Sequence, residues 1–183
     1  AIGYQALQDQ DGGDTFNIAV GYQAGRNVTS GTQNILIGAS AGDTLTTGGR
    51  NVAIGYQALK TEDAHGKNVA IGYEALEMLD AGTDAYNVAV GYNAGVLITT
   101  GGQNTIIGGL AGDALTSGNN NTALGYSTLG AETLGDRNVA IGNFALQVQN
   151  NTSNADVYNT AVGFAAGASV TTGIYNNIIG GLA

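Results

Sequence analysis

Short apolar segments of one design recur along the chain, and each begins with an asparagine. In NVAIG, residues 51–55, the β-branched Val52 and Ile54 alternate with the small Ala53 and Gly55. An alternation with a period of two predicts a β-strand and not a helix. One side of this strand is aliphatic, and the other side is nearly bare.

A second run of apolar residues and threonines precedes the next asparagine in several repeats. TLTTGG at 44–49 and LITTGG at 97–102 are examples, and both end in glycines that are typical of a turn. Each repeat therefore reads as strand, bend, strand and turn, which together make one closed coil. Equivalent residues of stacked coils lie about 4.8 Å apart. We expect the asparagine side chains to form a ladder of amide hydrogen bonds between coils.

The repeat N-[VIT]-A-[IV]-G-Y-x-A-[LG] recurs with a 17-residue spacing, which is longer only from Asn68 to Asn87 and from Asn138 to Asn159. Its asparagines are Asn17, Asn34, Asn51, Asn68, Asn87, Asn104, Asn121, Asn138, Asn159 and Asn176. The glycine of the repeat stands at Gly3, Gly21, Gly38, Gly55, Gly72, Gly91, Gly108, Gly125, Gly142, Gly163 and Gly180. A glycine at one fixed point indicates a positive φ angle or a backbone approach too close for a Cβ atom. The sequence predicts an all-β parallel solenoid, or β-roll, of about ten 17-residue coils.

Residues 1–183 form a single repeat array, in which units four apart resemble each other most and define a super-repeat of roughly 70–72 residues. Because the array begins and ends inside a repeat, we expect it to be a segment of a longer fibre. In one unit of each super-repeat the third residue is bulky and the sixth is small, in place of the usual alanine and aromatic. These pairs are Leu36 with Ala39, Ile106 with Gly109, and Ile178 with Gly181. We expect the two side chains of each pair to fill a shared volume.

A single coil buries too few aliphatic side chains to offset the entropy lost when its backbone is ordered, so neighbouring coils must stabilise it. The thin solenoid leaves one strand face of alanine and glycine. We expect this bare face to pack against other copies of the chain.

Composition and charge exclude several classes of protein. The chain has 31 glycines, no proline and no cysteine, and it is 43% hydrophobic but only 10% charged, which argues against disorder. Its net charge of −9, with five lysines and arginines, argues against nucleic acid or an anionic membrane as partner. No stretch approaches the roughly 18 consecutive apolar residues of a membrane span, so no membrane insertion is predicted. The absence of cysteine excludes disulfides and thiolate metal sites.

The phrases NVAIGYQAL, NVAIGYEAL and NVAVGYNAG, with the TTGG-x-N turns, resemble the head repeats of the trimeric autotransporter adhesins. They equally resemble the repeat-built shafts of bacteriophage tail fibres. The resemblance covers essentially the whole chain and implies left-handed coils, a homotrimer around a common axis, and an extracellular role as a rigid spacer or adhesive head. It places the protein on a cell surface or virion appendage, with a host-surface receptor or glycan as a further partner. The 17-residue repeat is longer than the adhesin coil.

One segment, KTEDAHGKN at 60–68, combines residues that could act as metal ligands or as an acid and a base. A plain exposed turn is the preferred interpretation, so no catalytic residue, metal or cofactor is predicted, and the chain is not expected to be an enzyme. The longest excursions are residues 60–67, 77–86, 130–137 and 147–158, and ligand binding is expected there. The candidate exposed-loop binding residues are Glu62, Asp63, His65, Asp80 and Asp84.

The remaining patterns have structural interpretations. Asp43 and Asp113 follow glycine and favour a turn or capping role over calcium binding. The threonine pairs are explained by strand propensity without ice binding. The repeated tyrosines favour a structural stack over a platform for sugar rings. Two alternatives stay open, a stand-alone solenoid that binds carbohydrate or ice, and an enzyme whose carboxylates converge across coils near His65.

Overall fold

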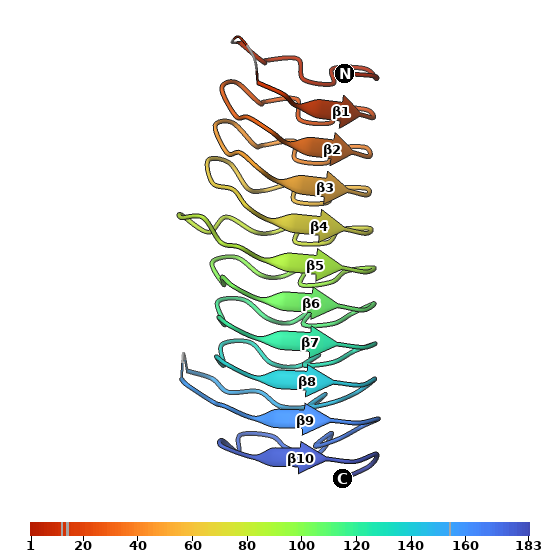
Figure 1. Ribbon diagram of the computed structural model, residues 1–183, viewed down its shortest axis with the longest axis vertical. Coiled ribbons are helices and arrows are strands. Elements are labelled where there is room, and N and C mark those ends of the chain that lie inside the picture. Colours follow the sequence, from red (N-terminus) through yellow and green to blue (C-terminus); the bar gives the residue numbers. More distant parts are fainter. Residues whose placement is uncertain (12, 14, 154) are drawn as a thin grey trace.

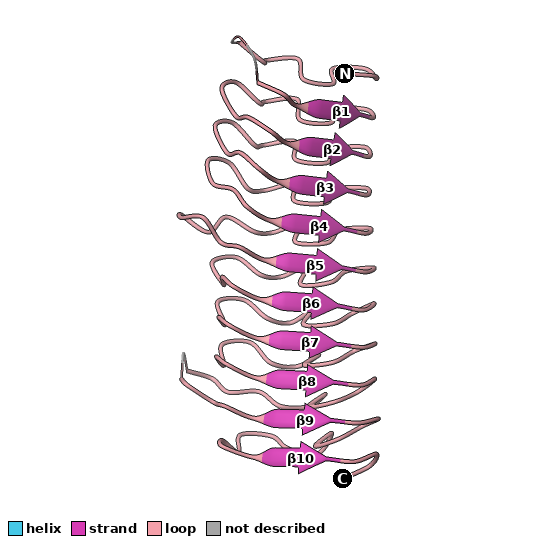
Figure 2. Cartoon of the chain, viewed as in Figure 1, coloured by secondary structure: helices cyan, strands magenta, loops and turns pink. Residues whose placement is uncertain are grey.

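The chain forms a column of stacked coils with its two ends at opposite ends of the column (Figure 1). The computed structural model describes residues 1–11, 13, 15–153 and 155–183. This part of the chain contains no helix, and ten strands make one parallel sheet in chain order along one side of the column (Figure 2). The strands are β1 (Ile18–Val20), β2 (Ile35–Ile37), β3 (Val52–Ile54), β4 (Val69–Ile71), β5 (Val88–Val90), β6 (Thr105–Ile107), β7 (Thr122–Leu124), β8 (Val139–Ile141), β9 (Thr160–Val162) and β10 (Asn177–Ile179). The predicted all-β parallel solenoid is confirmed.

Equivalent residues of successive repeats lie beside one another in the sheet. Ala53 pairs with Ala70, Ile54 pairs with Ile71, and Ile71 pairs in turn with Val90. The longer interval between β4 and β5 keeps this register. Extra residues are therefore accommodated outside the sheet.

Each coil contains one strand, and the predicted second strand is wrong. The rest of the coil is a series of turns whose N–H groups donate to the next coil, as from Thr46 N to Asp63 O (2.5 Å) and from Leu59 N to Ala75 O (3.0 Å). Leu59 also has a positive φ angle of 51°, which an extended strand does not contain. The runs rich in threonine thus form bends, although they keep hydrogen bonds between coils.

The middle residue of each strand points into the column, and the two outer residues point away from it. In β3 the side chain of Ala53 is fully buried, whereas Val52 and Ile54 are partly exposed. The prediction that the bare face packs against other copies is therefore wrong. The alanines line the core because the thin column leaves little space there, and the aliphatic residues form its outer surface.

The bulky third residues occupy space beside glycines of the opposite wall. A Cβ atom added to Gly25 would lie 2.5 Å from Leu36 Cδ1, and one added to Gly42 would lie 2.8 Å from Leu36 Cδ2. The next coil has Ala53 as its third residue and the buried Leu59 at the position of these glycines. The large side chain that fills the interior thus stands at the third residue of the repeat in one coil, as at Leu36, and at the ninth residue in the next, as at Leu59.

The expected shared volume with the sixth residue is wrong. Leu36 is fully buried, whereas the aromatic side chains that occupy the sixth position of other coils, such as Tyr56, are exposed on the outside. Ala39 replaces an outer aromatic and not a neighbour of Leu36 in the core.

The repeated glycine meets both expectations. Gly55 has a φ of 138°, and a Cβ atom on it would lie 2.1 Å from the carbonyl oxygen of Gly72 in the next coil. Neither the backbone conformation nor the space admits a side chain. The spacing of the coils depends on this position.

The predicted asparagine ladder is confirmed, and most of its links run from a backbone N–H to a side-chain oxygen. Two links also join side-chain amides, from Asn138 Nδ2 to Asn121 Oδ1 (3.1 Å) and from Asn176 Nδ2 to Asn159 Oδ1 (3.0 Å). Asn51 N donates to Asn34 Oδ1 (2.9 Å), and Asn68 N donates to Asn51 Oδ1 (3.0 Å). Asn51 Nδ2 donates to the His65 carbonyl of its own coil (3.1 Å). Amides such as that of Asn51 therefore close one coil and fix it to the next, whereas Asn138 Oδ1 accepts no hydrogen bond among the described residues. No helix in the described part of the chain is long and apolar enough to cross a membrane.

Candidate functional site

The first and third residues of β1–β10 form a continuous surface that we call the outer aliphatic face, in which the first residue is polar only in β6, β7, β9 and β10. Its third-residue column is aliphatic in all ten strands, and none of these side chains is buried. The column consists of Val20, Ile37, Ile54, Ile71, Val90, Ile107, Leu124, Ile141, Val162 and Ile179. Ten strands spaced about 4.8 Å apart extend it over roughly 43 Å. No strand residue is charged.

An interrupted series of aromatic side chains runs beside this face, most of them two residues after a strand, and Ala39 and Gly109 stand at that place after β2 and β6. The rings of Tyr56 and Tyr73 stack at 5.1 Å between centroids, and those of Tyr73 and Tyr92 stack at 5.2 Å. The full set is Tyr4, Tyr22, Tyr56, Tyr73, Tyr92, Tyr126, Phe144 and Phe164. Tyr126, Phe144 and Phe164 meet edge to face, at 5.6 and 5.9 Å between centroids. Since neighbouring rings contact one another, these aromatic residues support the structural interpretation. The ring edges remain exposed, and the outer apolar surface is wider as a result.

Two of the four predicted excursions leave the column. The loop within 77–86, between β4 and β5, and the loop within 147–158, between β8 and β9, protrude from it (Figure 1). Residue 154 lies outside the described residues. The segments 60–67 and 130–137 instead belong to 17-residue coils and follow the path of their neighbours. Of the four predicted excursions, the two in the longer intervals between repeat asparagines protrude.

The five candidate binding residues divide between surface and interior. Asp63, Asp80 and Asp84 are exposed, and His65 is half-buried. Glu62 is fully buried, so its assignment to an exposed loop is wrong. The sequence contained the signal for this burial, because an alignment of the coils on their asparagines places Glu62 in a column of aliphatic residues.

This interior column stands at one fixed position after each repeat asparagine. Leu45 and Leu79 are the neighbours of Glu62 in it, and both are fully buried. Its other members are Val28, Ile98, Leu115, Glu132, Gln149 and Val170. Burial raises the pKa of Glu62, while the backbone N–H and imidazole of His65 act in the opposite direction. His65 N donates to Glu62 Oε1 (3.1 Å), and among the described residues Glu62 Oε2 accepts no hydrogen bond.

Glu132 is the second buried carboxylate of this column, and its oxygens are fully satisfied. Oε1 accepts the backbone N–H groups of residues 133, 134, 135 and 151 at 2.8 to 3.2 Å. Oε2 accepts Gln149 Nε2 (2.7 Å) and Asn151 Nδ2 (3.1 Å). Such a carboxylate stabilises the coil without a ligand.

Side-chain atoms of Glu62, Asp63 and His65 lie within 4.8 Å of one another. His65 Nδ1 is 3.5 Å from Glu62 Oε1 and has no hydrogen-bond partner among the described residues. Asp84 is engaged by Lys67 Nζ (2.5 Å), whose hydrogen bond lowers the pKa of Asp84. The three residues that are near His65 in the sequence therefore also lie close together in the structure, and Glu62 among them is buried.

The two aspartates compared with calcium-binding repeats are coil residues. Arg26 Nε lies 3.1 Å from Asp43 Oδ1, and burial raises the pKa of Asp43 against the effect of Arg26. Burial likewise raises the pKa of Asp113, while its own backbone N–H and that of Ala114 oppose the rise. These contacts agree with a turn role.

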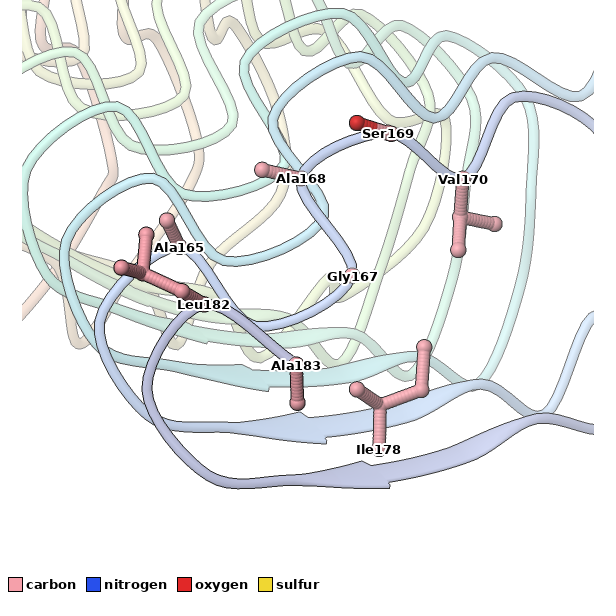
Figure 3. Close-up of a pocket in the computed structure, with 8 residues that line it drawn as sticks. All are labelled: Ala165, Gly167, Ala168, Ser169, Val170, Ile178, Leu182 and Ala183. Carbon is pink, nitrogen blue, oxygen red and sulfur yellow. The ribbon is translucent and has the colours of Figure 1, made fainter.

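A hollow of about 460 Å³ lies at the last coil, lined by residues that include Gly167, Val170 and Ile178 (Figure 3). Ile178 corresponds to Ile106 one super-repeat earlier, which is fully buried by the following coil. The hollow is therefore the stacking surface of a coil and not a ligand pocket.

Comparisons with protein families, with curated proteins and with solved structures found no match to this chain. The resemblance to adhesin heads and tail-fibre shafts rests on the repeat itself and stays a prediction.

Proposed function

We propose that the chain is a segment of an extracellular structural and adhesive fibre, a rigid spacer on a cell surface or virion. It assembles with further copies of itself along the outer aliphatic face. The function is mechanical, and the residues that contact a receptor or glycan lie in the protruding loops.

The observation that carries this proposal is the exposed aliphatic side of an all-parallel sheet. Parallel sheets are normally covered on both faces, and exposed apolar patches beyond a few hundred Å² mark interaction surfaces. Here the interior face is covered by the coil itself, whereas the column from Val20 to Ile179 is open to solvent in the single chain.

A second copy is the partner that fits this surface best. The face repeats at about 4.8 Å, and a surface with the same pitch and length matches it without gaps. Its strands contain no charged residue although the chain has a net charge of −9, so charge complementarity gives no reason for a foreign partner. The number of three copies and the left-handed winding come from the family resemblance.

The mass of the purified chain in solution tests the proposal, measured by multi-angle light scattering. A homotrimer has three times the chain mass of 18.3 kDa. A monomer over the accessible concentration range would overturn the proposal. If that monomer bound immobilised glycans or slowed the growth of ice crystals, the stand-alone binding solenoid would take its place.

A further inference from the structure

We infer that Glu62, Asp63 and His65 bind one divalent transition-metal ion, with Zn²⁺ as the ion of best fit, at a corner of the third full coil. The site is independent of the proposed assembly, because it is built from one segment of a single chain.

The Glu62 carboxylate is buried with too few partners. It lies between Leu45 and Leu79 in the interior column, and a buried carboxylate needs several donors or a cation. Only the backbone N–H of His65 donates to it within hydrogen-bond distance among the described residues. The backbone N–H of Ala81 is also near this carboxylate. Glu62 Oε2 is left without a donor.

Glu132, one super-repeat later, provides an internal comparison. The donors to Glu132 Oε2 are the side chains of Gln149 and Asn151. At the matching positions the Glu62 corner has Leu79 and Ala81, which carry no donor in their side chains. Glu62 therefore lacks the two side-chain amide donors that satisfy the Glu132 carboxylate.

His65 stands where the other 17-residue coils have glycine, as at Gly48 and Gly135. A Cβ atom on Gly135 would lie 2.8 Å from the Glu132 carboxyl carbon, so a side chain there is brought against the buried carboxylate. In the coil that contains Glu62, His65 provides a side chain at this position. It adds a nitrogen atom where the other 17-residue coils have no side chain.

The geometry suits a small ion with nitrogen and oxygen ligands. Zn²⁺ binds imidazole nitrogen at about 2.0–2.1 Å and carboxylate oxygen at about 2.0–2.2 Å, so two tetrahedral ligands lie roughly 3.3 Å apart. Glu62 Oε1 and His65 Nδ1 are 3.5 Å apart. Asp63 is exposed, and its side chain can rotate to complete three protein ligands, with water in the remaining position. Ca²⁺ fits less well because it prefers six to eight oxygens.

The local charge also favours a cation. Glu62 and Asp63 place two carboxylates in this corner, and Asp80 lies close to Glu62. The nearby Lys67 is engaged by Asp84 and by the Tyr86 hydroxyl at 2.8 Å. A divalent ion would supply the charge that this corner lacks.

The test uses the full chain without a histidine tag, because His65 is its single histidine. Titration with ZnCl₂ is followed by calorimetry and by the imidazole NMR signals of His65. We expect one ion per chain, micromolar affinity, shifted His65 signals and weaker binding as the pH falls and protons compete. The melting temperature should rise with Zn²⁺.

Three variants separate this site from adventitious binding. Glu62→Leu installs the residue type of its column neighbours, so it is expected to fold and to lose binding by more than tenfold. His65→Gln should lose binding to a similar extent, whereas Glu132→Gln should retain it. No shift of the His65 signals in the wild type, or Zn²⁺ affinity in Glu62→Leu and His65→Gln equal to that of the wild type, would overturn the inference. The oligomer mass of Glu62→Leu is measured alongside and is expected to equal that of the wild type.

Discussion

Replacement of one repeated glycine by alanine should destabilise the column far more than such a change normally does. At Gly72 the φ angle is 138°, and the new Cβ atom would lie 2.2 Å from the carbonyl oxygen of Gly91. A side chain in this region of backbone space costs about 1–3 kcal/mol. Relief of the overlap separates the coils of Gly72 and Gly91 and weakens the hydrogen bonds between them from Gly91 N to Ile71 O (2.8 Å) and from Asn93 N to Tyr73 O (2.9 Å), each contributing about 1 kcal/mol. The expected loss is roughly 3–5 kcal/mol.

Gly82 provides the matched control for this experiment. Its φ angle is also positive, at 68°, but no atom lies within 4 Å of an added Cβ, so Gly82→Ala should cost only about 1–2 kcal/mol. Urea unfolding followed by circular dichroism measures both variants. Equal midpoints for Gly72→Ala and Gly82→Ala would refute the close-approach explanation, because conformational strain alone would then explain both.

Three further substitutions test the interior and the outer face. Glu62→Leu should be more stable than the wild type at neutral pH in metal-free buffer. Burial raises the pKa of Glu62 in the folded chain, so the contribution of Glu62 to stability is greatest below the unfolded pKa of 4.5 and is lost as the pH rises through the folded pKa. The stability difference between Glu62→Leu and the wild type, measured by urea titration, should therefore grow as the pH rises above 4.5. A difference that stays constant with pH would contradict this. Gln149→Leu removes one donor from the buried Glu132 carboxylate and should cost about 1–3 kcal/mol by the same assay, whereas an unchanged stability would show that this hydrogen bond is dispensable. Ile71→Asp places a charge on the outer aliphatic face and should reduce the mass in light scattering to that of one chain, with the circular dichroism spectrum retained; an unchanged oligomer would place the interface elsewhere.

The sequence was sufficient to predict the columns of the fold. The spacing of Asn51 and Asn68, with a glycine at the same place after each, puts like residues beside one another, because the backbone hydrogen bonds of a parallel sheet tolerate no slip. The same glycine predicted the close approach that Gly55 and Gly72 make. These features follow from steric rules that act over short stretches of chain.

The direction of the strand faces could not be predicted from the alternation alone. Val52, Ala53 and Ile54 give the same period whichever face is interior, and the usual expectation places the larger side chains inside. The deciding quantity is the interior volume of one coil, to which distant residues such as Leu59 contribute. The expected second strand failed for a similar reason, since the threonine run at 44–49 forms turns and bends and is flanked by positive φ angles at Gly42 and Arg50.

The candidate site was predicted in part. The grouping of Glu62, Asp63 and His65 was visible as a short motif, but charge alone suggested a solvated turn. Comparison with Leu45 and Leu79 at the same place in the repeat would have shown that Glu62 is interior. In a solenoid, the column of a residue is a better guide to burial than its neighbours in sequence.

Thiol reactivity on the outer aliphatic face tests most directly whether copies of the chain cover it. The sequence has no cysteine, so Ile71→Cys gives a single thiol on the face and Thr83→Cys gives one on the exposed 77–86 loop. Reaction with a soluble disulfide reagent is followed in the native assembly and after dilution. We expect the thiol at position 71 to react roughly tenfold or more slowly than the thiol at position 83 in the assembly, and to lose this protection on dissociation. Equal reactivity of the two thiols in the native protein would contradict burial of the outer aliphatic face between copies.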